Sequence, residues 1–189
     1  GTFEMSGGEI SNNTTTNFGG GVFNKRGIFT MSDGTTISGN KAMYGGGVYK
    51  ESGTFTMSGG TITGNESAGM SGNASGGGVY NDADAFTMSG GTITQNKSQC
   101  DGGGVYNRSG TFEMSGGAIT DNETKEYGGG VCNEDGTFEM SGGEITRNKS
   151  EKNGGGVQHA SQEPFKMSGT AKITNNTCLL YTSPSPRDG

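Results

Sequence analysis

The sequence predicts an all-β solenoid, a parallel β-helix of about seven coils, and three observations lead to it. A unit of 26 residues recurs along the chain, the apolar residues of each unit fall in short alternating stretches, and 40 of the 189 residues are glycine. Only 27% of the residues are hydrophobic, so one broad core cannot form. The strict periodicity nevertheless distinguishes this chain from a disordered one, because every unit places its few large apolar residues at the same intervals.

Methionine marks the unit most clearly, since successive repeat methionines lie 26, 26, 31, 26, 26 and 27 residues apart. They are Met5, Met31, Met57, Met88, Met114, Met140 and Met167. A Phe precedes each of them by two positions, at Phe3, Phe29, Phe55, Phe86, Phe112, Phe138 and Phe165. An Ile follows each, at Ile10, Ile37, Ile62, Ile93, Ile119, Ile145 and Ile173. An Asn follows each Ile by three positions, at Asn13, Asn40, Asn65, Asn96, Asn122, Asn148 and Asn176. Six units also carry a triple glycine before a valine, at Val22, Val48, Val79, Val105, Val131 and Val157.

Each unit is expected to form three short strands. Phe-x-Met and Thr-Ile-Thr alternate with the period of two that is typical of strands, and Val is followed by Tyr or Phe in four of the six units. Glycine, Asn, Ser and Asp bound these stretches, and no helical spacing occurs. One unit therefore corresponds to one turn of a three-sided coil. Coils stacked in register would bring like residues together in columns, with strands about 4.8 Å apart and a rod on the order of 30–35 Å long.

Two further features should hold neighbouring coils together. The Asn column is expected to be buried, because a side-chain amide can both donate and accept hydrogen bonds between coils. The triple glycine should form a sharp corner at which a Cβ would collide with the next coil. Glycine in the turns 107–111 and 133–137 is expected to adopt positive φ. Length changes are confined to the turn after the Asn, with a ten-residue segment at 66–75.

The compound motif resembles a known family. GGGVYN, GTFTMSGG and TITGN are similar to the right-handed parallel β-helix repeats of bacterial secreted and surface proteins, whose fold is related to that of pectin lyase. The matching units cover residues 1–177. The resemblance implies a right-handed parallel β-helix, an extracellular or cell-surface location, and a place within a long adhesin-like chain. It implies no activity.

The last residues depart from the repeat. The string CLLYTSPSPRD at 178–188 abandons the period and resembles a sequencing adapter translated in one frame. We therefore expect two parts: a repeat domain at 1–177 that is a fragment open at both ends, and a non-native, disordered tail at 178–189.

Charge and hydropathy narrow the expected partners. The net charge of −6 argues against nucleic acid, which requires clustered Lys and Arg. No apolar run approaches the roughly 20 residues that a bilayer-spanning helix needs. If the chain binds a partner, the sequence favours glycans or molecules of a host or envelope surface, with no nucleic acid and no membrane insertion.

Three carboxylates are the strongest candidates for catalysis. Glu113 and Glu139 occupy one outward column and Glu144 follows closely, so they could perform acid–base cleavage of a polysaccharide. The alternative is a solvated face, in which Lys166 and Lys172 form exposed ion pairs with Glu139 and Glu144. The second interpretation is favoured, because threonine fills the same columns in other units. No catalytic, cofactor-binding or metal residue is therefore assigned.

A nucleophilic cysteine is a weaker hypothesis. Cys132 stands where other units have Tyr, and His159, the only histidine, lies in the next unit. No third group that would orient the histidine is evident, so Cys132 is expected to replace an outward aromatic residue. Cys100 falls in a variable turn and in another column, which argues against a disulfide with Cys132.

Other surface features suggest binding rather than chemistry. Tyr49, Tyr80 and Tyr106 form a column that could stack on sugars if exposed, or pack on a sheet face if covered. The segment 66–75 is the other candidate surface. Threonine columns around Thr61 resemble the arrays of ice-binding β-helices, but Glu, Ala and Lys interrupt them. The Asn-x-Ser/Thr sites at Asn65, Asn96, Asn122 and Asn148 fall on the Asn column and are expected to be buried. The calcium-binding nonapeptide pattern is absent.

The sequence thus favours a non-catalytic structural or adhesive segment of a bacterial cell-surface or secreted protein. A polysaccharide lyase or hydrolase that uses surface carboxylates is the alternative, and ice binding is a remote one.

Overall fold

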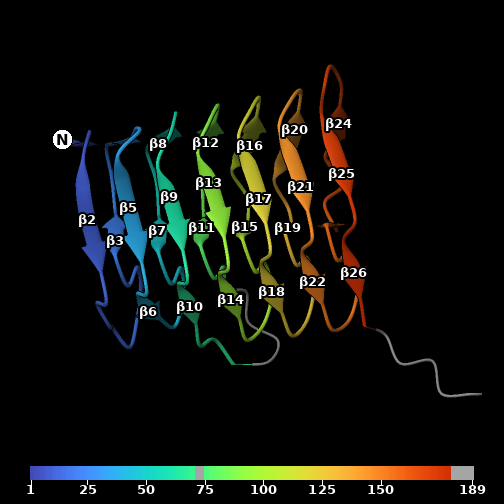
Figure 1. Cartoon of the computed structure of the whole chain (residues 1–189), viewed down its shortest axis with the longest axis horizontal. Coiled ribbons are helices and arrows are strands. Elements are labelled where there is room, and N and C mark those ends of the chain that lie inside the picture. The colour runs from blue at the N-terminus through green and yellow to red at the C-terminus, as the bar shows by residue number, and fades with distance from the viewer. Residues whose placement is uncertain (71–74, 180–189) are drawn as a thin grey trace, which may run out of the picture.

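The computed structural model describes residues 1–70 and 75–179, and these residues form a β-solenoid (Figure 1). The coils stand side by side along the long axis, and their strands assemble into four parallel sheets, two of seven strands and two of six. The predicted columns are confirmed, since Phe86 pairs in register with Phe112, Ile93 with Ile119 and Val79 with Val105. Within residues 1–70 and 75–179, no helix has the length and apolar character required to cross a bilayer.

Each sheet is named here after its recurrent residues. The Phe–Met sheet contains β1 (Thr2–Met5), β4 (Ile28–Met31), β8 (Thr54–Met57), β12 (Ala85–Met88), β16 (Thr111–Met114), β20 (Thr137–Met140) and β24 (Phe165–Met167). The Ile sheet contains β2 (Gly8–Ser11), β5 (Thr35–Ser38), β9 (Thr61–Thr63), β13 (Thr92–Thr94), β17 (Ala118–Thr120), β21 (Glu144–Thr146) and β25 (Lys172–Thr174). The Val sheet contains β3 (Val22–Asn24), β7 (Val48–Lys50), β11 (Val79–Asn81), β15 (Val105–Asn107), β19 (Val131–Asn133) and β23 (Val157–His159).

The short sheet was not expected, and it corrects the prediction of three strands per coil to about four. It contains β6 (Lys41–Ala42), β10 (Glu66–Ser67), β14 (Lys97–Ser98), β18 (Glu123–Thr124), β22 (Lys149–Ser150) and β26 (Thr177–Cys178). Each of its strands directly follows the Asn of the repeat and is two residues long. Alternation cannot be recognised over two residues, so the periodicity carried no signal for this side of the coil.

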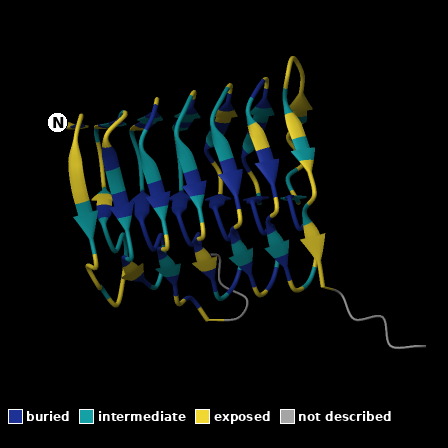
Figure 2. Ribbon diagram, in the orientation of Figure 1, coloured by how far each residue is buried: buried dark blue, intermediate teal, exposed yellow. Residues whose placement is uncertain are grey.

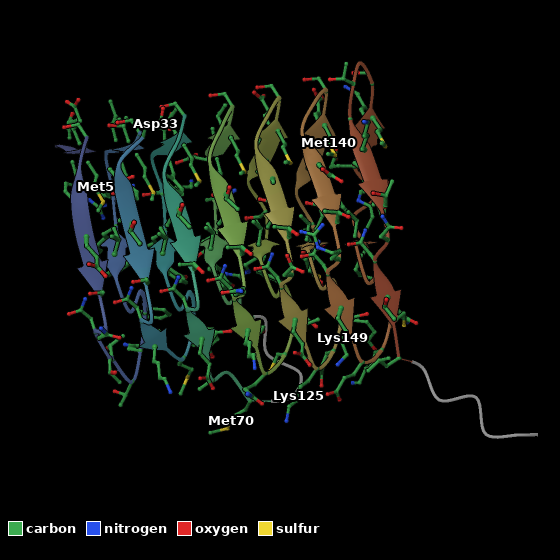
Figure 3. All side chains as sticks on the ribbon, viewed as in Figure 1. Met5, Asp33, Met70, Lys125, Met140 and Lys149 are labelled. Atoms are coloured by element: carbon green, nitrogen blue, oxygen red, sulfur yellow. The ribbon has the colours of Figure 1, made fainter. Side chains whose placement is uncertain are left out.

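The apolar columns fill the interior, and much of the ribbon of the inner coils is coloured as buried (Figure 2). Phe29, Phe55, Phe86, Phe112 and Phe138 are fully buried, and neighbouring rings among them stack with centroids 4.6–4.9 Å apart. Offset stacking of this kind stabilises beyond the burial of area alone. The Met, Ile and Val columns join the same core. In Figure 3, the labelled Met5 and Met140 mark the first coil and the sixth.

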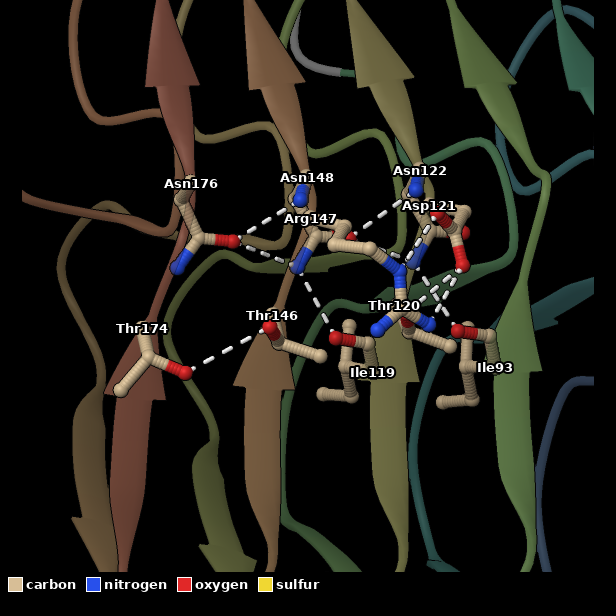
Figure 4. A network of polar contacts seen from close by, with 10 residues as sticks. All are labelled: Ile93, Ile119, Thr120, Asp121, Asn122, Thr146, Arg147, Asn148, Thr174 and Asn176. Carbon is tan, nitrogen blue, oxygen red and sulfur yellow. Dashed lines mark hydrogen bonds and ion pairs between the residues drawn. The ribbon is translucent and has the colours of Figure 1, made fainter.

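The Asn column forms the expected amide ladder (Figure 4). The backbone N–H and the Nδ2 of Asn122 both donate to Oδ1 of Asn148, at 3.0 and 2.9 Å, and the same Nδ2 donates to the carbonyl oxygen of Ile93 at 2.9 Å. Five of these asparagines, at positions 40, 65, 96, 122 and 148, are buried. Each of these five amides therefore ties three successive coils together, and the Asn-x-Ser/Thr sites at positions 65, 96, 122 and 148 are inaccessible.

The triple glycine forms the predicted corner. A Cβ on Gly103 would lie 2.5 Å from the carbonyl oxygen of Gly129 in the next coil, which no side chain can tolerate. The expectation for the other turn is wrong, because Gly110 and Gly136 do not adopt a left-handed φ. Glycine is required there for close approach instead, since a Cβ on Gly136 would overlap the carbonyl oxygen of Gly110.

The predicted domain boundary, between residues 177 and 178, falls within β26 of the short sheet. β26 includes Cys178, which pairs in register with Ser150. Most of the predicted tail, at 180–189, lies outside the described residues, and the boundary stays a prediction.

Candidate functional site

A hollow of about 410 Å³ opens on the outer face of the Phe–Met sheet. Strands β12, β16, β20 and β24 and the turns that follow them form its walls. The alternation of these strands sends Phe and Met inward and the residue between them outward, so the hollow is lined by Thr87, Glu113, Glu139 and Lys166. This is where the sequence placed its candidate carboxylates.

The structure brings together two of the three predicted carboxylates. Glu113 and Glu139 are paired in register on β16 and β20. Glu144 lies on β21, in the Ile sheet, and does not line the hollow. The predicted group of three is therefore divided between two sheets.

One of the two ion pairs expected for these columns is confirmed. Lys166 Nζ donates to Glu139 Oε1 at 2.8 Å. Lys172 pairs in register with Glu144, but no ion pair joins these two described residues. The hydrogen bond with Glu139 raises the pKa of Lys166, so this amine is a cation at neutral pH. A protonated lysine held by a carboxylate is not available as a general base.

The cysteine hypothesis fails on geometry. Cys132 pairs in register with Gln158, whereas His159 pairs with Asn133 and lies within 3.0 Å of its amide through Nδ1. Since adjacent residues of a strand point to opposite faces, Cys132 and His159 cannot approach one another. Burial, the largest cause, and the nearby charges of Asp101 and Glu134 raise the pKa of the Cys132 thiol. Cys132 is a packing residue, as the sequence favoured.

The tyrosine column faces away from the main core, as expected, and other side chains cover it. Tyr49, Tyr80 and Tyr106 are only 3–7% exposed. They form a second apolar cluster with Cys132 on the side of the Val sheet away from the main core, and Phe18, Tyr44 and Tyr127 pack against it. Burial raises the pKa of Tyr80 to about 12. Of the two interpretations of this column, packing on a sheet face holds, and sugars cannot stack on the rings.

The predicted binding segment at 66–75 is described only in part. Residues 71–74 lie outside the described residues. Before them, the thiol of Cys100 donates to the carbonyl oxygens of Gly69 at 3.2 Å and Met70 at 2.8 Å. Cys100 is fully buried and Met70 is exposed at the edge of the solenoid (Figure 3). The cysteine in the variable turn thus anchors the start of this segment.

A second polar column was missed by the sequence analysis. It runs inside the Val sheet through Asn81, Asn107 and Asn133, and their Nδ2 to Oδ1 hydrogen bonds are 2.6 Å long. His159 ends the column. The recurrent Asn after Val-Tyr in GGGVYN was the signal that could have revealed it.

Lys50 interrupts this second column. Its side chain is fully buried, and Nζ donates to the carbonyl oxygens of Gly53, at 2.8 Å, and Ala83. Burial lowers the pKa of Lys50 to about 8, against the opposing effect of Asp84 and Asp82. Asn81 Oδ1, one coil away, is buried without a hydrogen-bond partner in the described structure.

Charges of alternating sign follow the short sheet, which sequence reasoning also missed. Lys41, Glu66, Lys97, Glu123 and Lys149 are neighbours in register. The pairs Lys41–Glu66 and Lys149–Glu123 are 3.3 Å apart. Exposed ion pairs of this kind stabilise by about 0–1 kcal/mol each. They favour the correct register of the short sheet rather than form a site.

No match to a known protein adds to this picture. No family model, no curated protein and no solved structure matches the chain. Within the described ranges, no three His, Cys, Asp or Glu side chains are close enough to hold a metal ion. The class that the fold defines is a β-solenoid repeat protein, with an open polar hollow on its Phe–Met face.

Proposed function

We propose that this chain is a non-catalytic structural segment, a stiff spacer or adhesive rod, of a bacterial cell-surface or secreted protein. In this proposal the solenoid is a right-handed parallel β-helix of the kind found in pectin-lyase-like proteins. Its partners, if it binds any, are glycans or molecules of a host or envelope surface.

One observation carries the proposal: the repeated residues serve to join neighbouring coils. The Phe stack and the Asn ladder run from the first coil to the last. Every coil is therefore fixed to its neighbours by packing and by buried hydrogen bonds. Such a continuous stack resists bending and leaves few flexible segments for proteases, which suits a spacer.

The hollow around Glu139 favours a second candidate, cleavage of a polysaccharide. Two adjacent carboxylates and a lysine in an open groove could hydrogen-bond sugar hydroxyls. The ion pair between Lys166 and Glu139 weakens this candidate, because it engages the carboxylate that would have to act as acid or base.

Parallel binding and turnover assays separate the two candidates. The chain and its Glu139→Gln variant are incubated with a panel of acidic and neutral polysaccharides, and reducing ends and unsaturated products are measured. We expect no product above the protein-free background from either protein. Product that depends on Glu139 would establish the enzyme and overturn the structural proposal. A glycan array with the same two proteins distinguishes an adhesive rod from a spacer.

Protease resistance tests the spacer itself. Trypsin is added to the native chain, and cleavage after Lys25, Arg26, Lys125 and Lys152, which lie in turns of described coils, is followed by mass spectrometry. We expect these four sites to survive until the chain is unfolded in urea. Rapid cleavage at these sites in the native chain would contradict a stiff rod.

A further inference from the structure

The ion pairs of the short sheet fix its register, and they leave two lysines over. Lys97 belongs to β14, and Lys125 follows β18 directly. Both side chains are exposed, and neither takes part in an ion pair within the part of the chain that the structure describes. Glu123 is in register with Lys97, but its Oε1 accepts from Lys149 Nζ at 3.3 Å. Each of the two lysines therefore presents its ammonium group to solvent.

The two lysines share a hollow on the outer face of the short sheet. It measures about 150 Å³ and is lined by Lys97, Ser98, Gln99, Glu123 and Lys125. Strands β14 and β18 pair with one another and have β10 and β22 on their other sides, so the hollow lies within the sheet and not at its margin. Figure 3 shows the labelled Lys125 on this side of the solenoid.

The backbone places the polar groups of the hollow. The N–H of Gln99 donates to the carbonyl oxygen of Ser67 at 3.1 Å, and the N–H of Lys125 donates to that of Ser98 at 3.2 Å. These bonds continue the parallel pairing for one residue beyond each two-residue strand. Since side chains alternate along a strand, Lys97 and Gln99 face the same way, whereas Ser98 between them is buried. Two ammonium groups and one amide therefore line a single space from a fixed backbone.

The charges of the hollow favour a single anionic group. Its lining holds two ammonium groups and one carboxylate, so positive charge is in excess. A carboxylate or a sulfate ester can accept from both lysines, and charge-assisted hydrogen bonds of this kind are the strong ones. The carboxylate of Glu123 repels a second negative charge, which disfavours a phosphate dianion. The chain as a whole carries a charge of −6, which disfavours a dense polyanion.

Neighbouring coils do not repeat this set of groups. One coil earlier, Ala68 stands in the place of Gln99 and offers no side-chain donor. One coil later, Glu151 stands in the place of Lys125 and would repel an anion. The hollow is therefore made by residues that differ between units, while the repeated residues hold the stack together.

We propose that this hollow binds the acidic group of a sugar acid, a monoanionic carboxylate or sulfate ester carried by a glycan. Lys97 Nζ, Lys125 Nζ and Gln99 Nε2 donate to the anionic oxygens. Glu123 Oε2, the oxygen that Lys149 does not bind, accepts from a ring hydroxyl. The acidic group and the near edge of one ring occupy the hollow, and the rest of the glycan stays in solvent. This inference rests on the adhesive form of the proposed function and names its class of ligand.

Titrations of the ¹⁵N-labelled full-length chain test the class of ligand. The probes are D-glucuronate, D-glucose 6-sulfate, D-glucose 6-phosphate, D-glucose and acetate, with sodium chloride added to one constant ionic strength near pH 7.5. Amide signals of residues 97–99 and 123–125 report on the hollow. We expect saturable shifts with the monoanionic sugars, weaker binding of the phosphate and none of glucose. Glucuronate and the sulfate distinguish the two sources of the anionic group.

Matched variants test the residues. Lys97→Gln and Lys125→Gln should each weaken binding of the monoanionic sugar roughly tenfold, because each removes one charge-assisted hydrogen bond. Lys25→Gln makes the same change of net charge at an exposed lysine outside the hollow and should leave the affinity unchanged. Glu123→Gln removes the repulsion of a second charge, so the phosphate should then bind as tightly as the sulfate.

Failure of this site and failure of the proposed function give different results. Unshifted signals of the hollow with both monoanionic sugars, or equal losses in Lys97→Gln and Lys25→Gln, would overturn the site. Acetate that binds as tightly as glucuronate would overturn the assignment to a sugar. None of these results affects the protease resistance of the rod or its binding of neutral glycans. Release of reducing ends that depends on Glu139 would instead overturn the proposed function, whatever binds in the hollow.

Discussion

At the scale of single residues, the molecule buries polar groups mainly where each has a partner in the next coil. The two Asn columns achieve this with one residue type, because an amide donates and accepts in the same direction at every step. Lys50 breaks this pattern within the second column. It fills an Asn position with a group that can only donate, and Asn81 Oδ1 is left without a donor.

Replacing this lysine by asparagine should stabilise the fold. An asparagine side chain at this position would donate to the carbonyl oxygen of Gly53, as Asn107 does to Gly110 at 2.9 Å, and to Asn81 Oδ1. We expect the free energy of unfolding of Lys50→Asn to rise by about 1–3 kcal/mol at pH 7, since an unsatisfied buried acceptor is repaired and a buried cation removed. Urea unfolding measures it. Lys50→Met is the control, because it removes the charge without supplying a donor. Equal stability of the two variants would contradict the role given to Asn81.

Asp101 should make stability depend on pH. Burial, the largest cause, raises the pKa of Asp101 to about 6, above its ordinary value of 3.8, although the N–H of Tyr127 donates to its Oδ1 at 3.1 Å. The folded chain thus binds the proton more tightly than the unfolded chain. The stability that this carboxyl contributes is fully present below about pH 3.8 and is lost as the pH rises to about 6.

Thermal melts of Asp101→Asn check this dependence. The variant should match the parent near pH 4 and melt at a higher temperature near pH 7.5, because Asn can accept the Tyr127 hydrogen bond without a charge. Asp135→Asn, which changes an exposed carboxyl, serves as the comparison. A difference between Asp101→Asn and the parent that stays constant from pH 4 to 7.5 would argue against this explanation.

At the scale of elements, the sequence predicted those features that recur in a pattern longer than a few residues. The Phe, Met, Ile and Val columns and the Asn ladder all fall in this class, because each position repeats in nearly every unit. The short sheet was missed, since two residues carry no alternation. Whether the tyrosines are covered was left open for another reason. Phe18, Tyr44 and Tyr127 stand in the turn of variable length, so no fixed spacing shows that they fold back over Tyr49 and Tyr80.

The sequence could predict which residues of the candidate site share a column, but not how the columns are arranged around it. Register alone places Glu113 beside Glu139 and Lys166 after it, so the repeat was enough to predict these three neighbours. The division of Glu144 onto another sheet depends on a turn between β20 and β21, and on which way each strand faces. The hydrogen bonds of Lys50 likewise depend on a neighbouring coil, which no single unit reveals.

Disruption of the glycine corner should destabilise the fold strongly. In Gly103→Ala the new Cβ would meet two backbone oxygens, of Gly129 at 2.5 Å and of Glu123 at 2.7 Å, neither of which can move without breaking a sheet. We expect the free energy of unfolding to fall by about 3 kcal/mol or more. Gly7→Ala, where no atom lies within 4 Å, is expected to change it by less than about 0.5 kcal/mol. Urea unfolding of both variants measures the difference in their free energies of unfolding. Similar stabilities would show that the backbone at the corner can shift to accommodate the added Cβ.

At the scale of the whole molecule, the solenoid is a one-dimensional stack. Every sheet pairs a strand with the equivalent strand of the coils before and after it, so each described coil packs against the coils beside it. Stability is then a sum of coil and interface contributions, and no coil is unique to the fold. An interior coil should therefore be removable if the register of all four sheets is kept.

Deleting residues 105–130 tests this property. The deletion removes one complete unit of 26 residues and joins Gly104 to Val131, which restores a triple glycine followed by valine. Phe86 can then stack on Phe138, and Asn96 can donate to Asn148. We expect the shortened chain to fold, to retain the circular dichroism spectrum of the parent, and to unfold in urea cooperatively with an m-value lower by about one-seventh.

A half-unit deletion, 105–117, is the matched control. It joins Gly104 to Ala118 and puts the residues of the Ile sheet where the Val sheet should continue, so every later column faces the wrong neighbour. This chain should lose the spectrum and the cooperative transition, although it is longer than the first variant. If instead the 26-residue deletion abolished folding, the stability of the solenoid would reside in a particular coil and not in the stacking of equivalent ones.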